Sequence, residues 1–281
     1  MEHGPKLAEG KTKIVYAHPH DPSLAIIRHK DGITAGDGAR RHVIPGKGAL
    51  SGRTAANVFA LLGRAGIATH FVAAPTPDTM VVRRCRMIPL EVVTRRIATG
   101  SYLRRHPDVP EGTRFEPPLV EFFLKDDARH DPQVTAADIT ALGVADPAEV
   151  ERMAAVATEV FLLLERAWAA QGVTLCDLKI EFGRPEAGDE RWAMSDGETG
   201  SAGVGQPIAH HVSPDALLVA DVIDNDSWRI WPGGEKARML DKQVYRNMAD
   251  VTPEGLAGVR ARYETVAALT DAWREWDPFK R

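Results

Sequence analysis

Cysteine is scarce in this chain of 281 residues, which has only Cys85 and Cys176. A disulfide framework or a zinc site would need more cysteines at regular spacings, so these two classes of protein are excluded. We therefore expect two buried free thiols in a protein of a reducing compartment.

The chain also lacks an excess of positive charge and a long apolar run. Its formal net charge of -4 argues against general affinity for nucleic acid. No apolar run is long enough to span a membrane, and residues 1–5 lack the features of a signal peptide. These absences predict a cytoplasmic protein that binds neither nucleic acid nor membrane. The length suffices for one large domain or two smaller ones.

What the chain does have is a nine-residue stretch of alternating character, LCDLKIEFG at residues 175–183. Read as a strand, it places three apolar side chains on one face and three charged side chains on the other, namely Leu178, Ile180 and Phe182 against Asp177, Lys179 and Glu181. A solvent-facing sheet edge has a similar pattern, although such edges usually present Thr, Ser and Lys. Carboxylates can bind a metal and an ammonium can bind an anion, so the floor of a binding cleft fits equally well.

Three further stretches place charge beside turns or inside an apolar run. In GKTK at residues 10–13, glycine lets the backbone approach a phosphate, but the spacing is not that of a Walker A loop and a solvated turn is the commoner case. In RRIATGS at residues 95–101, two guanidiniums precede a Gly-Ser turn, as in a phosphate site or in an exposed basic strand end. Residues 217–223 predict a buried strand whose Asp221 needs a lysine or a metal as partner.

The remaining pattern predicts the elements around these stretches. Residues 6–30 predict a β-meander, and Ser51 begins an amphipathic helix that ends at Gly66. A long helix from about residue 150 to 171 should brace the strand at 175–183. Residues 184–214 are rich in Gly, Ser, Glu, Asp and Pro, which predicts a long loop or insertion.

Seven segments together resemble one family, the SAICAR synthetases (phosphoribosylaminoimidazole-succinocarboxamide synthases). The segments are GKTKIVY, ITAGDGAR, MIPLEVVTRRIATGS, EPPLVEFFLKDDARHDP, LCDLKIEFG, DNDSWRIW and DKQVYR. They follow the family order between residues 6 and 246, and those at residues 87–101 and 175–183 are specific enough to serve as signatures.

The chain departs from the common family pattern at one position of the late strand. Most bacterial members have Asp-Glu where this chain has Asp221-Val222, and the wording ADVIDNDSW is closest to the synthetase half of the animal bifunctional enzyme. That enzyme also carries an aminoimidazole carboxylase domain, for which we expect this chain to be too short.

The resemblance implies an ATP-dependent ligase of purine biosynthesis. It would join the amine of L-aspartate to the carboxylate of carboxyaminoimidazole ribonucleotide (CAIR), giving SAICAR, ADP and phosphate. A carboxylate is a poor acyl donor, so phosphorylation by ATP to an acyl phosphate would supply the leaving group. Catalysis would then depend mainly on positioning and charge neutralisation by Mg²⁺, lysines and arginines.

The resemblance also assigns roles to residues at matching positions. The ATP site would consist of Lys11, Lys13, Met87, Lys125 and Glu181, with the backbone near Met87 taking the adenine. Glu181 would also bind Mg²⁺ together with Asp221.

The substrate site is implied in the same way. Arg95, Ser101 and Arg229 would clamp the ribonucleotide phosphate, and Asp37 and Asp131 would shape the aspartate pocket or a second metal site. Asp177 and Lys179 would be the catalytic residues at the imidazole end, where Lys179 could pair with the carboxylate. With these roles, the charged face of residues 175–183 becomes the floor of the cleft.

The fold implied is α+β with two subdomains and an ATP cleft between them. Residues 1–86 would form a small antiparallel β subdomain over the nucleotide, and residues 87–281 a larger mixed α/β subdomain for substrate and metal. The partners would be small molecules, and a homo-oligomer is possible.

Three other functions were weighed against this one. A related carboxylate-amine ligase or kinase would act on another phosphorylated substrate. A non-catalytic nucleotide-binding module would have been favoured by loss of Lys11, Glu181 or Asp221, all of which are present. A nucleic-acid binder would have to use the arginine pairs at residues 83–84 and 95–96, and the acidic balance and the lack of interleaved aromatics argue against it.

Overall fold

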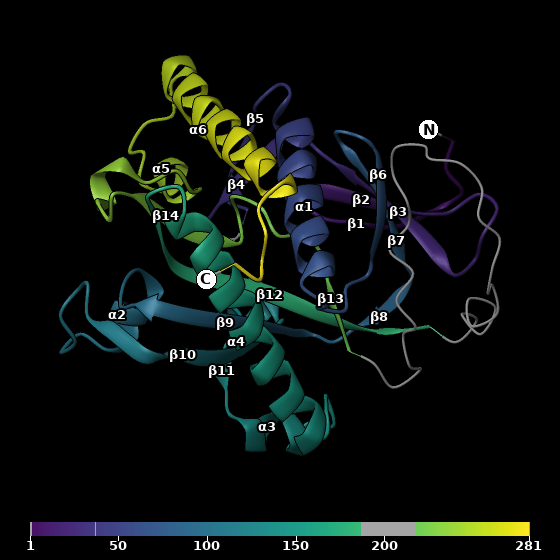
Figure 1. The fold of residues 1–281 in the computed structure, drawn as a ribbon, viewed down its shortest axis with the longest axis horizontal. Helices are drawn as coiled ribbons and strands as arrows, with labels where there is room; N and C mark the ends of the chain where they lie inside the picture. Colours follow the sequence, from purple (N-terminus) through teal and green to yellow (C-terminus); the bar gives the residue numbers. More distant parts are fainter. Residues whose placement is uncertain (1, 37, 187–216, 281) are drawn as a thin grey trace.

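The computed structural model describes residues 2–36, 38–186 and 217–280, and it has two antiparallel sheets with helices packed on them (Figure 1). The five-stranded sheet has the strand order β1-β2-β3-β7-β6, and the seven-stranded sheet has the order β11-β10-β9-β12-β13 with β8 and β14 also paired to β12. A separate hairpin consists of β4 (Gly32–Ala35) and β5 (Arg40–Val43). Sheets and helices in this arrangement confirm the α+β class.

The N-terminal sheet confirms the meander predicted for residues 6–30. Its strands are β1 (Lys6–Glu9), β2 (Lys13–Ala17), β3 (Leu24–His29), β6 (Phe71–Thr76) and β7 (Thr79–Arg83). Helix α1 (Lys47–Arg64) packs against this sheet with its apolar positions, Ala55, Val58, Phe59 and Leu62, all buried. The turn between β1 and β2 carries Lys11 at the edge of the sheet.

Helix α1 begins four residues earlier than the sequence predicted, at Lys47 instead of Ser51. The cap is supplied from a distance, because the carboxylate of Asp31 accepts hydrogen bonds from the backbone N–H groups of Gly46 (3.0 Å) and Gly48 (2.8 Å). Ser51 therefore lies buried inside the helix. The predicted stop is confirmed, since Gly66 follows the last turn with a φ of +84°.

Strand β12 (Val173–Pro185) is the centre of the second sheet. It is long enough to pair with four strands: β9 (Leu90–Ile97), β14 (Trp228–Pro232), β13 (Leu218–Ala220) and β8 (Cys85–Met87). Beyond β9 lie β10 (Arg114–Leu124) and β11 (Gln133–Val134). The alternation predicted for residues 175–183 is confirmed, because Leu178, Ile180 and Phe182 lie in the core while the charged residues face the other side.

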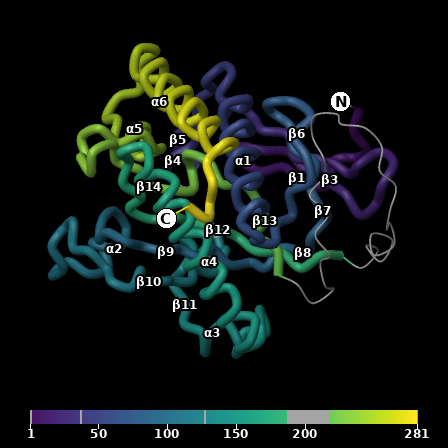
Figure 2. Tube along the Cα trace, in the orientation of Figure 1, coloured from purple at the N-terminus to yellow at the C-terminus, as the bar shows by residue number. Residues whose placement is uncertain are grey.

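Helix α4 (Pro147–Ala169) covers the apolar face of β12, as the sequence predicted, although it starts earlier than residue 150. A capping box between Asp146 and Glu149, with Pro147 in the first turn, fixes that start. Helix α6 (Pro253–Asp271), capped by Thr252, returns beside α1 from the far end of the chain (Figure 2). The short elements are α2 (Ser101–Arg105), η1 (Asp127–Arg129), α3 (Ala136–Ala141), η3 (Lys236–Arg238), α5 (Gln243–Arg246) and η4 (Ala272–Arg274).

Two predicted elements need correction. The buried strand expected over residues 217–223 is limited to β13, because Asp221 has a φ of +64°, which a strand cannot adopt. The loop expected over residues 184–214 does not begin at 184, since β12 continues to Pro185 and pairs with β8 there. Residues 187–214 of that predicted loop lie outside the described residues.

The two cysteines are both free, as predicted, but they differ in environment. Cys176 is buried, and burial raises the pKa of its thiol, whereas Cys85 is half-buried rather than buried. No helix among the described residues is both long and apolar enough to cross a membrane.

Candidate active site

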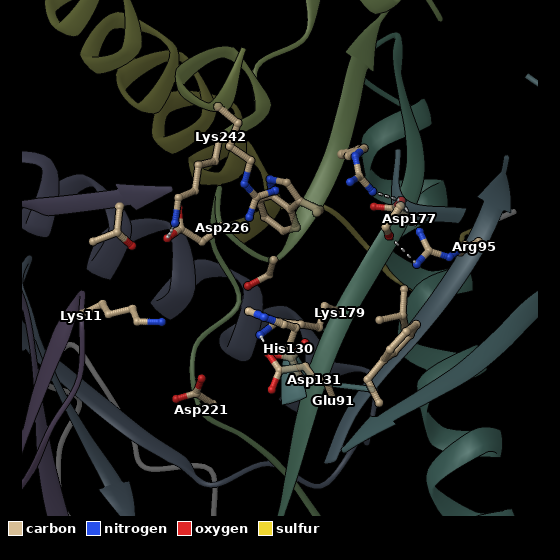
Figure 3. Close-up of a pocket in the computed structure, with 18 of the residues that line it drawn as sticks. Lys11, Glu91, Arg95, His130, Asp131, Asp177, Lys179, Asp221, Asp226 and Lys242 are labelled. Carbon is tan, nitrogen blue, oxygen red and sulfur yellow. Dashed lines mark hydrogen bonds and ion pairs between the residues drawn. The ribbon is translucent and has the colours of Figure 1, made fainter. Parts of the chain in front are cut away.

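A cleft of about 650 Å³ lies where the N-terminal sheet meets β12. Its walls come from the turn at residues 11–13, from β9 and β12, from α2, and from the segments at residues 130–133 and 221–229. Figure 3 shows side chains from these elements pointing into one space. Among the described residues, nine Lys or Arg side chains and five carboxylates line it, so the cleft is basic although the whole chain is acidic.

Most of the residues predicted for the site lie together in this cleft. Those that line it are Lys11, Lys13, Arg95, Ser101, Asp131, Asp177, Lys179, Asp221 and Arg229. Met87, Lys125 and Glu181 are not among the lining residues; Met87 is exposed on β8, and Lys125 contacts Glu181 beside the cleft (Nζ to Oε2, 2.6 Å). Asp37 lies outside the described residues.

Arg95 is held in the cleft wall by two carboxylates. Its guanidinium donates to Asp177 (Nη1 to Oδ2, 2.9 Å) and to Glu121, and its remaining nitrogen lies 3.4 Å from the hydroxyl of Ser101. Arg229 donates to the same oxygen of Asp177. Asp177 raises the pKa of Arg229, which therefore stays charged. The three residues predicted to clamp the phosphate thus lie together, and carboxylates hold both arginines in position.

Glu121 is a member of this cluster that the sequence analysis missed. It is only 4% exposed and accepts hydrogen bonds from Arg95 on one side and Arg105 on the other. The available signal was a single acid inside the apolar run LVEFFL of β10. A carboxylate in such a run needs cationic partners, as Asp221 does in residues 217–223.

Lysines and carboxylates alternate at the other end of the cleft. Lys13 of the N-terminal sheet forms an ion pair with Asp221, which directly follows β13. Lys179 donates to Glu91 (2.5 Å) and lies 3.4 Å from Glu181. Glu181 pairs in register with Ala220, the last residue of β13, so Asp221 directly follows the residue opposite Glu181.

The pKa values at this end reflect the competition between burial and charge. Burial lowers the pKa of Lys13 to about 8, although nearby Glu181 acts to raise it. Burial also acts to lower the pKa of Lys179, but Glu181 and Glu91 outweigh it and the pKa is raised. Burial would raise the pKa of Glu181, yet three lysines, Lys179 above all, hold it below its usual value. Lys179 and Glu181 are therefore both charged at neutral pH.

A third cluster fixes Lys242 at the mouth of the cleft. Asp226 accepts hydrogen bonds from Lys242 (2.7 Å) and from the phenol of Tyr263 on α6 (2.7 Å). Lys47, which is 1% exposed, lies 5.0 Å from the centre of the Tyr263 ring. The sequence analysis gave neither Lys47 nor Tyr263 a role in the site, because nothing local to either residue indicates a charged partner.

The carboxylate oxygens of Glu181 and Asp221 are of the kind that a magnesium ion takes as ligands. Asp221 directly follows the residue opposite Glu181 in the sheet, and each carboxylate forms an ion pair with a lysine, Asp221 with Lys13 and Glu181 with Lys125. The described residues contain no group of three or more His, Cys, Asp or Glu able to hold a metal. Mg²⁺ is commonly bound by one or two carboxylates plus the phosphates of a substrate, so two carboxylates suffice.

The two antiparallel sheets and a cleft lined by more cations than carboxylates define an α+β protein whose cleft suits anionic ligands. Comparison with known proteins identifies the group. The SAICAR synthetase family matches residues 6–197 and 211–261. The chain is 66% identical over 273 residues to a phosphoribosylaminoimidazole-succinocarboxamide synthase of Roseiflexus castenholzii, covering 97% of this chain and 99% of that protein. The chain belongs to the SAICAR synthetase family.

Other comparisons agree with this assignment. A bifunctional phosphoribosylaminoimidazole carboxylase/succinocarboxamide synthetase of Drosophila melanogaster is 42% identical over 270 residues, which are 94% of this chain and 57% of that protein. The crystal structure of the Ehrlichia chaffeensis synthase has a TM-score of 0.78 at 28% identity and covers 95% of this chain and 98% of its own. A SAICAR synthetase solved in complex with ADP has a TM-score of 0.73 at 30% identity, covering 92% and 97%.

Proposed function

We propose that this protein joins L-aspartate to the carboxylate of CAIR with ATP, giving SAICAR, ADP and phosphate. The observation that carries the proposal is the convergence in one basic cleft of Arg95, Ser101, Arg229, Lys179 and Lys13, which come from five separate segments of a chain with this family membership. All three substrates are anions, and a cleft with an excess of cations suits them. The ADP bound to a relative supports ATP as the co-substrate.

The reaction runs in two steps on this proposal. An oxygen of the CAIR carboxylate attacks the γ-phosphorus of ATP, the bond to the β-phosphate oxygen breaks, and ADP leaves. The aspartate amine then attacks the acyl carbon, phosphate leaves with the electron pair of the C–O bond, and the nitrogen loses a proton. Lys179 faces the cleft beside Asp177, where its charge can neutralise the carboxylate during the first step.

The remaining groups bind and orient. Arg95, Ser101 and Arg229, which line the cleft, would receive the ribonucleotide phosphate. Lys11 and Lys13 of the cleft, together with Lys125 beside it, would bind the phosphates of ATP. Mg²⁺, when bound, neutralises charge on those phosphates, and Glu181 and Asp221 would hold it. Met87, which is exposed on β8 outside the lining of the cleft, would take the adenine through its backbone.

The proposal is tested by measuring ADP release from the purified protein with Mg-ATP, L-aspartate and CAIR, each omitted in turn. ADP and SAICAR should form in equal amounts and only when all three are present. Release of ADP without aspartate would indicate a kinase-like activity instead. Bound nucleotide without any turnover would favour a binding module.

The acyl phosphate has its own isotopic test. With ¹⁸O in the CAIR carboxylate, one labelled oxygen should appear in the released phosphate, because that oxygen forms the bond to phosphorus. Unlabelled phosphate would exclude this route while leaving the overall ligation intact.

Asp221→Asn tests the metal assignment. It removes the charge of one carboxylate but keeps the side-chain volume, so the Mg²⁺ concentration for half-maximal rate should rise about tenfold or more. Thermal unfolding should show an intact fold. Asp250→Asn, at an exposed position outside the cleft, is the matched control. An unchanged rate at limiting Mg²⁺ would refute the role of Asp221.

A further inference from the structure

A buried polar cluster lies behind the wall of the cleft, where α1 and α6 meet the segment between β13 and β14. Asp224, Lys47 of α1 and Tyr263 of α6 are each 3% exposed or less. Neither the binding of the substrates nor the two chemical steps gives any of these residues a task. A buried polar group costs free energy unless it is paired, so the partners of these groups indicate what the cluster does.

Asp226 connects this cluster to the cleft, which it lines. Its two oxygens have different partners, because Oδ1 accepts a hydrogen bond from the phenol of Tyr263 and Oδ2 accepts one from the ammonium of Lys242, each at 2.7 Å. Figure 3 shows the side chain of Lys242 directed at Asp226. The backbone of Lys242 is held as well, since its N–H donates to the carbonyl of Asn225 (3.2 Å). A hydrogen bond on each oxygen leaves the carboxylate of Asp226 little freedom to turn.

Tyr263 is the neutral donor among these charged groups. Burial acts to raise the pKa of Asp226, but Lys242 and Lys47 outweigh it and hold the pKa below its usual value. Asp226 is therefore a carboxylate at neutral pH and can only accept hydrogen bonds. Burial, with Asp226 and Asp224 nearby, raises the pKa of the Tyr263 phenol, so its proton stays in place. Tyr263 thus donates to Asp226 without adding a charge to the cluster.

The hydroxyl of Tyr263 is separable from the packing of its ring. The ring belongs to a small hydrophobic cluster with Ile33, Ile44, Tyr245 and Val259. A phenylalanine would fill the same place and would lose only the hydrogen bond to the carboxylate. Packing therefore explains the ring, and the hydroxyl needs a reason of its own.

We propose that Tyr263 is a positioning residue for the ligation, acting on the cleft from α6 through Asp226. Its phenol fixes one oxygen of Asp226, so the other oxygen is presented to Lys242 in one direction and the ammonium keeps its place at the mouth of the cleft. A cation whose position is fixed beforehand loses less freedom when it meets an anionic substrate. Tyr263 does not line the cleft and so acts only through its partners. This inference rests on the proposed function, which supplies the reaction in which the effect is measured.

The test compares Tyr263→Phe with Tyr245→Phe. The control removes a second buried phenol, on α5, whose oxygen lies 2.8 Å from Nδ1 of His42 and which does not line the cleft. Because Asp226 is held by one donor fewer in Tyr263→Phe, the KM for CAIR, for L-aspartate or for both should rise about fivefold or more, with a smaller change in kcat. The control should leave every KM within about twofold of the original. Urea denaturation should show similar losses of stability in the two variants.

A double-variant cycle with Lys242→Gln shows whether Tyr263 acts through Lys242. Lys242→Gln removes the charge but keeps a hydrogen-bond donor for Asp226, and it should raise the same KM. Adding Tyr263→Phe to it should change that KM by less than about twofold, because the ammonium that the phenol positions is gone. Two effects that multiply in the double variant would show that the phenol acts elsewhere, and the proposal would be wrong.

Each other outcome has a definite meaning. A fall in kcat with every KM unchanged in Tyr263→Phe would mean that less of the protein is folded and active, so Tyr263 would only hold the fold. Kinetics equal to those of the unaltered protein would overturn the proposal as well. Failure of the proposed function itself would be seen separately, as the absence of aspartate-dependent ADP release in the unaltered protein.

Discussion

Arg95 and Arg96 are neighbours on β9, yet their side chains enter opposite sides of the sheet. Arg95 meets Glu121 and lines the cleft, whereas Arg96 makes two hydrogen bonds with Glu165 of α4 (2.7 and 2.8 Å). Both pairs join an arginine of β9 to a glutamate of a neighbouring element, but only Arg95 lines the cleft, and Glu165 is less buried than Glu121. This makes Glu165 a matched control for the role of Glu121.

Glu121→Gln should loosen the phosphate clamp. The variant removes the charge that lies between Arg95 and Arg105, so Arg95 keeps only Asp177 as a carboxylate partner and Arg105 keeps none. We expect the KM for CAIR to rise about fivefold or more and stability to fall by about 3 kcal/mol. Glu165→Gln should lower stability without changing the KM. Equal stability losses with an unchanged KM in both variants would show that Glu121 only holds the fold.

A substitution at Gly100 tests the position of Arg229 by steric displacement instead of by loss of charge. Gly100 has a φ of +59°, and a Cβ added there would lie 2.4 Å from the guanidinium of Arg229. Gly100→Ala should therefore displace Arg229 and raise the KM for CAIR, in addition to a backbone cost of about 1–2 kcal/mol. Gly112→Ala has the same kind of backbone strain with nothing within 4 Å, so steady-state kinetics on the pair separate the two effects. A similar KM in both would contradict the displacement.

At the level of elements, the packing of α1 on the N-terminal sheet buries two histidines. Burial lowers the pKa of His29 on β3 and of His70 before β6 to about 3 each. Because the unfolded chain takes up these protons near pH 6.5 and the folded chain does not, their contribution is complete above pH 6.5. It is lost progressively as the pH falls from 6.5 toward 3.

The expected result is a fall in the free energy of unfolding between pH 7.5 and pH 5, measured by urea denaturation. His70→Gln should make this fall smaller, even if the variant is less stable at pH 7.5. His20→Gln, at an exposed position, should leave the slope as it is. Identical slopes in all three proteins would show that the buried histidines do not set the acid sensitivity.

Local pattern predicted those elements whose ends are also fixed locally. Strand β12 has its alternation, and the end of α1 has Gly66, whose φ of +84° suits a glycine that follows a helix. The start of α1 depends on Asp31, which is distant in sequence, and the end of β13 depends on the left-handed backbone of Asp221. Neither can be found by counting apolar positions.

The same distinction applies to the candidate site. The alternation of residues 175–183 predicted Asp177, Lys179 and Glu181 as a charged row. The site residues in the turns were predicted from the family resemblance instead. Glu121 and Lys47 act through partners on other elements, and their own segments look like ordinary packing. Predicting them would require the pairing of β9 with β10 and of α1 with α6 beforehand.

At the scale of the whole molecule, one hydrophobic cluster extends across the boundary predicted near residue 86. It includes Ile27, Phe59 and Met80 from one side of that boundary and Phe161 and Phe182 from the other. Strand β8 also joins β12 there. The division into two subdomains at residue 86 stays a prediction. If it holds, the two subdomains share one hydrophobic core.

A shared core predicts one cooperative transition for the ligand-free protein. Unfolding in urea followed by far-ultraviolet circular dichroism and by tryptophan fluorescence should give coincident curves, since Trp168, Trp228 and Trp273 form one cluster within the C-terminal part. Two separate midpoints would instead show that residues 1–86 unfold as a unit of their own.

The basic cleft in an acidic protein has a consequence for the speed of encounter. At a net charge of -4 the molecule as a whole repels its anionic substrates, while the lining of the cleft attracts them. Field lines converge on such a concave basic surface, so diffusing anions are guided toward the opening and away from the rest of the surface. Salt screens this guidance within about 10 Å at 0.1 M. Association rates should then fall as ionic strength rises, while dissociation, governed by the short-range contacts inside, changes little.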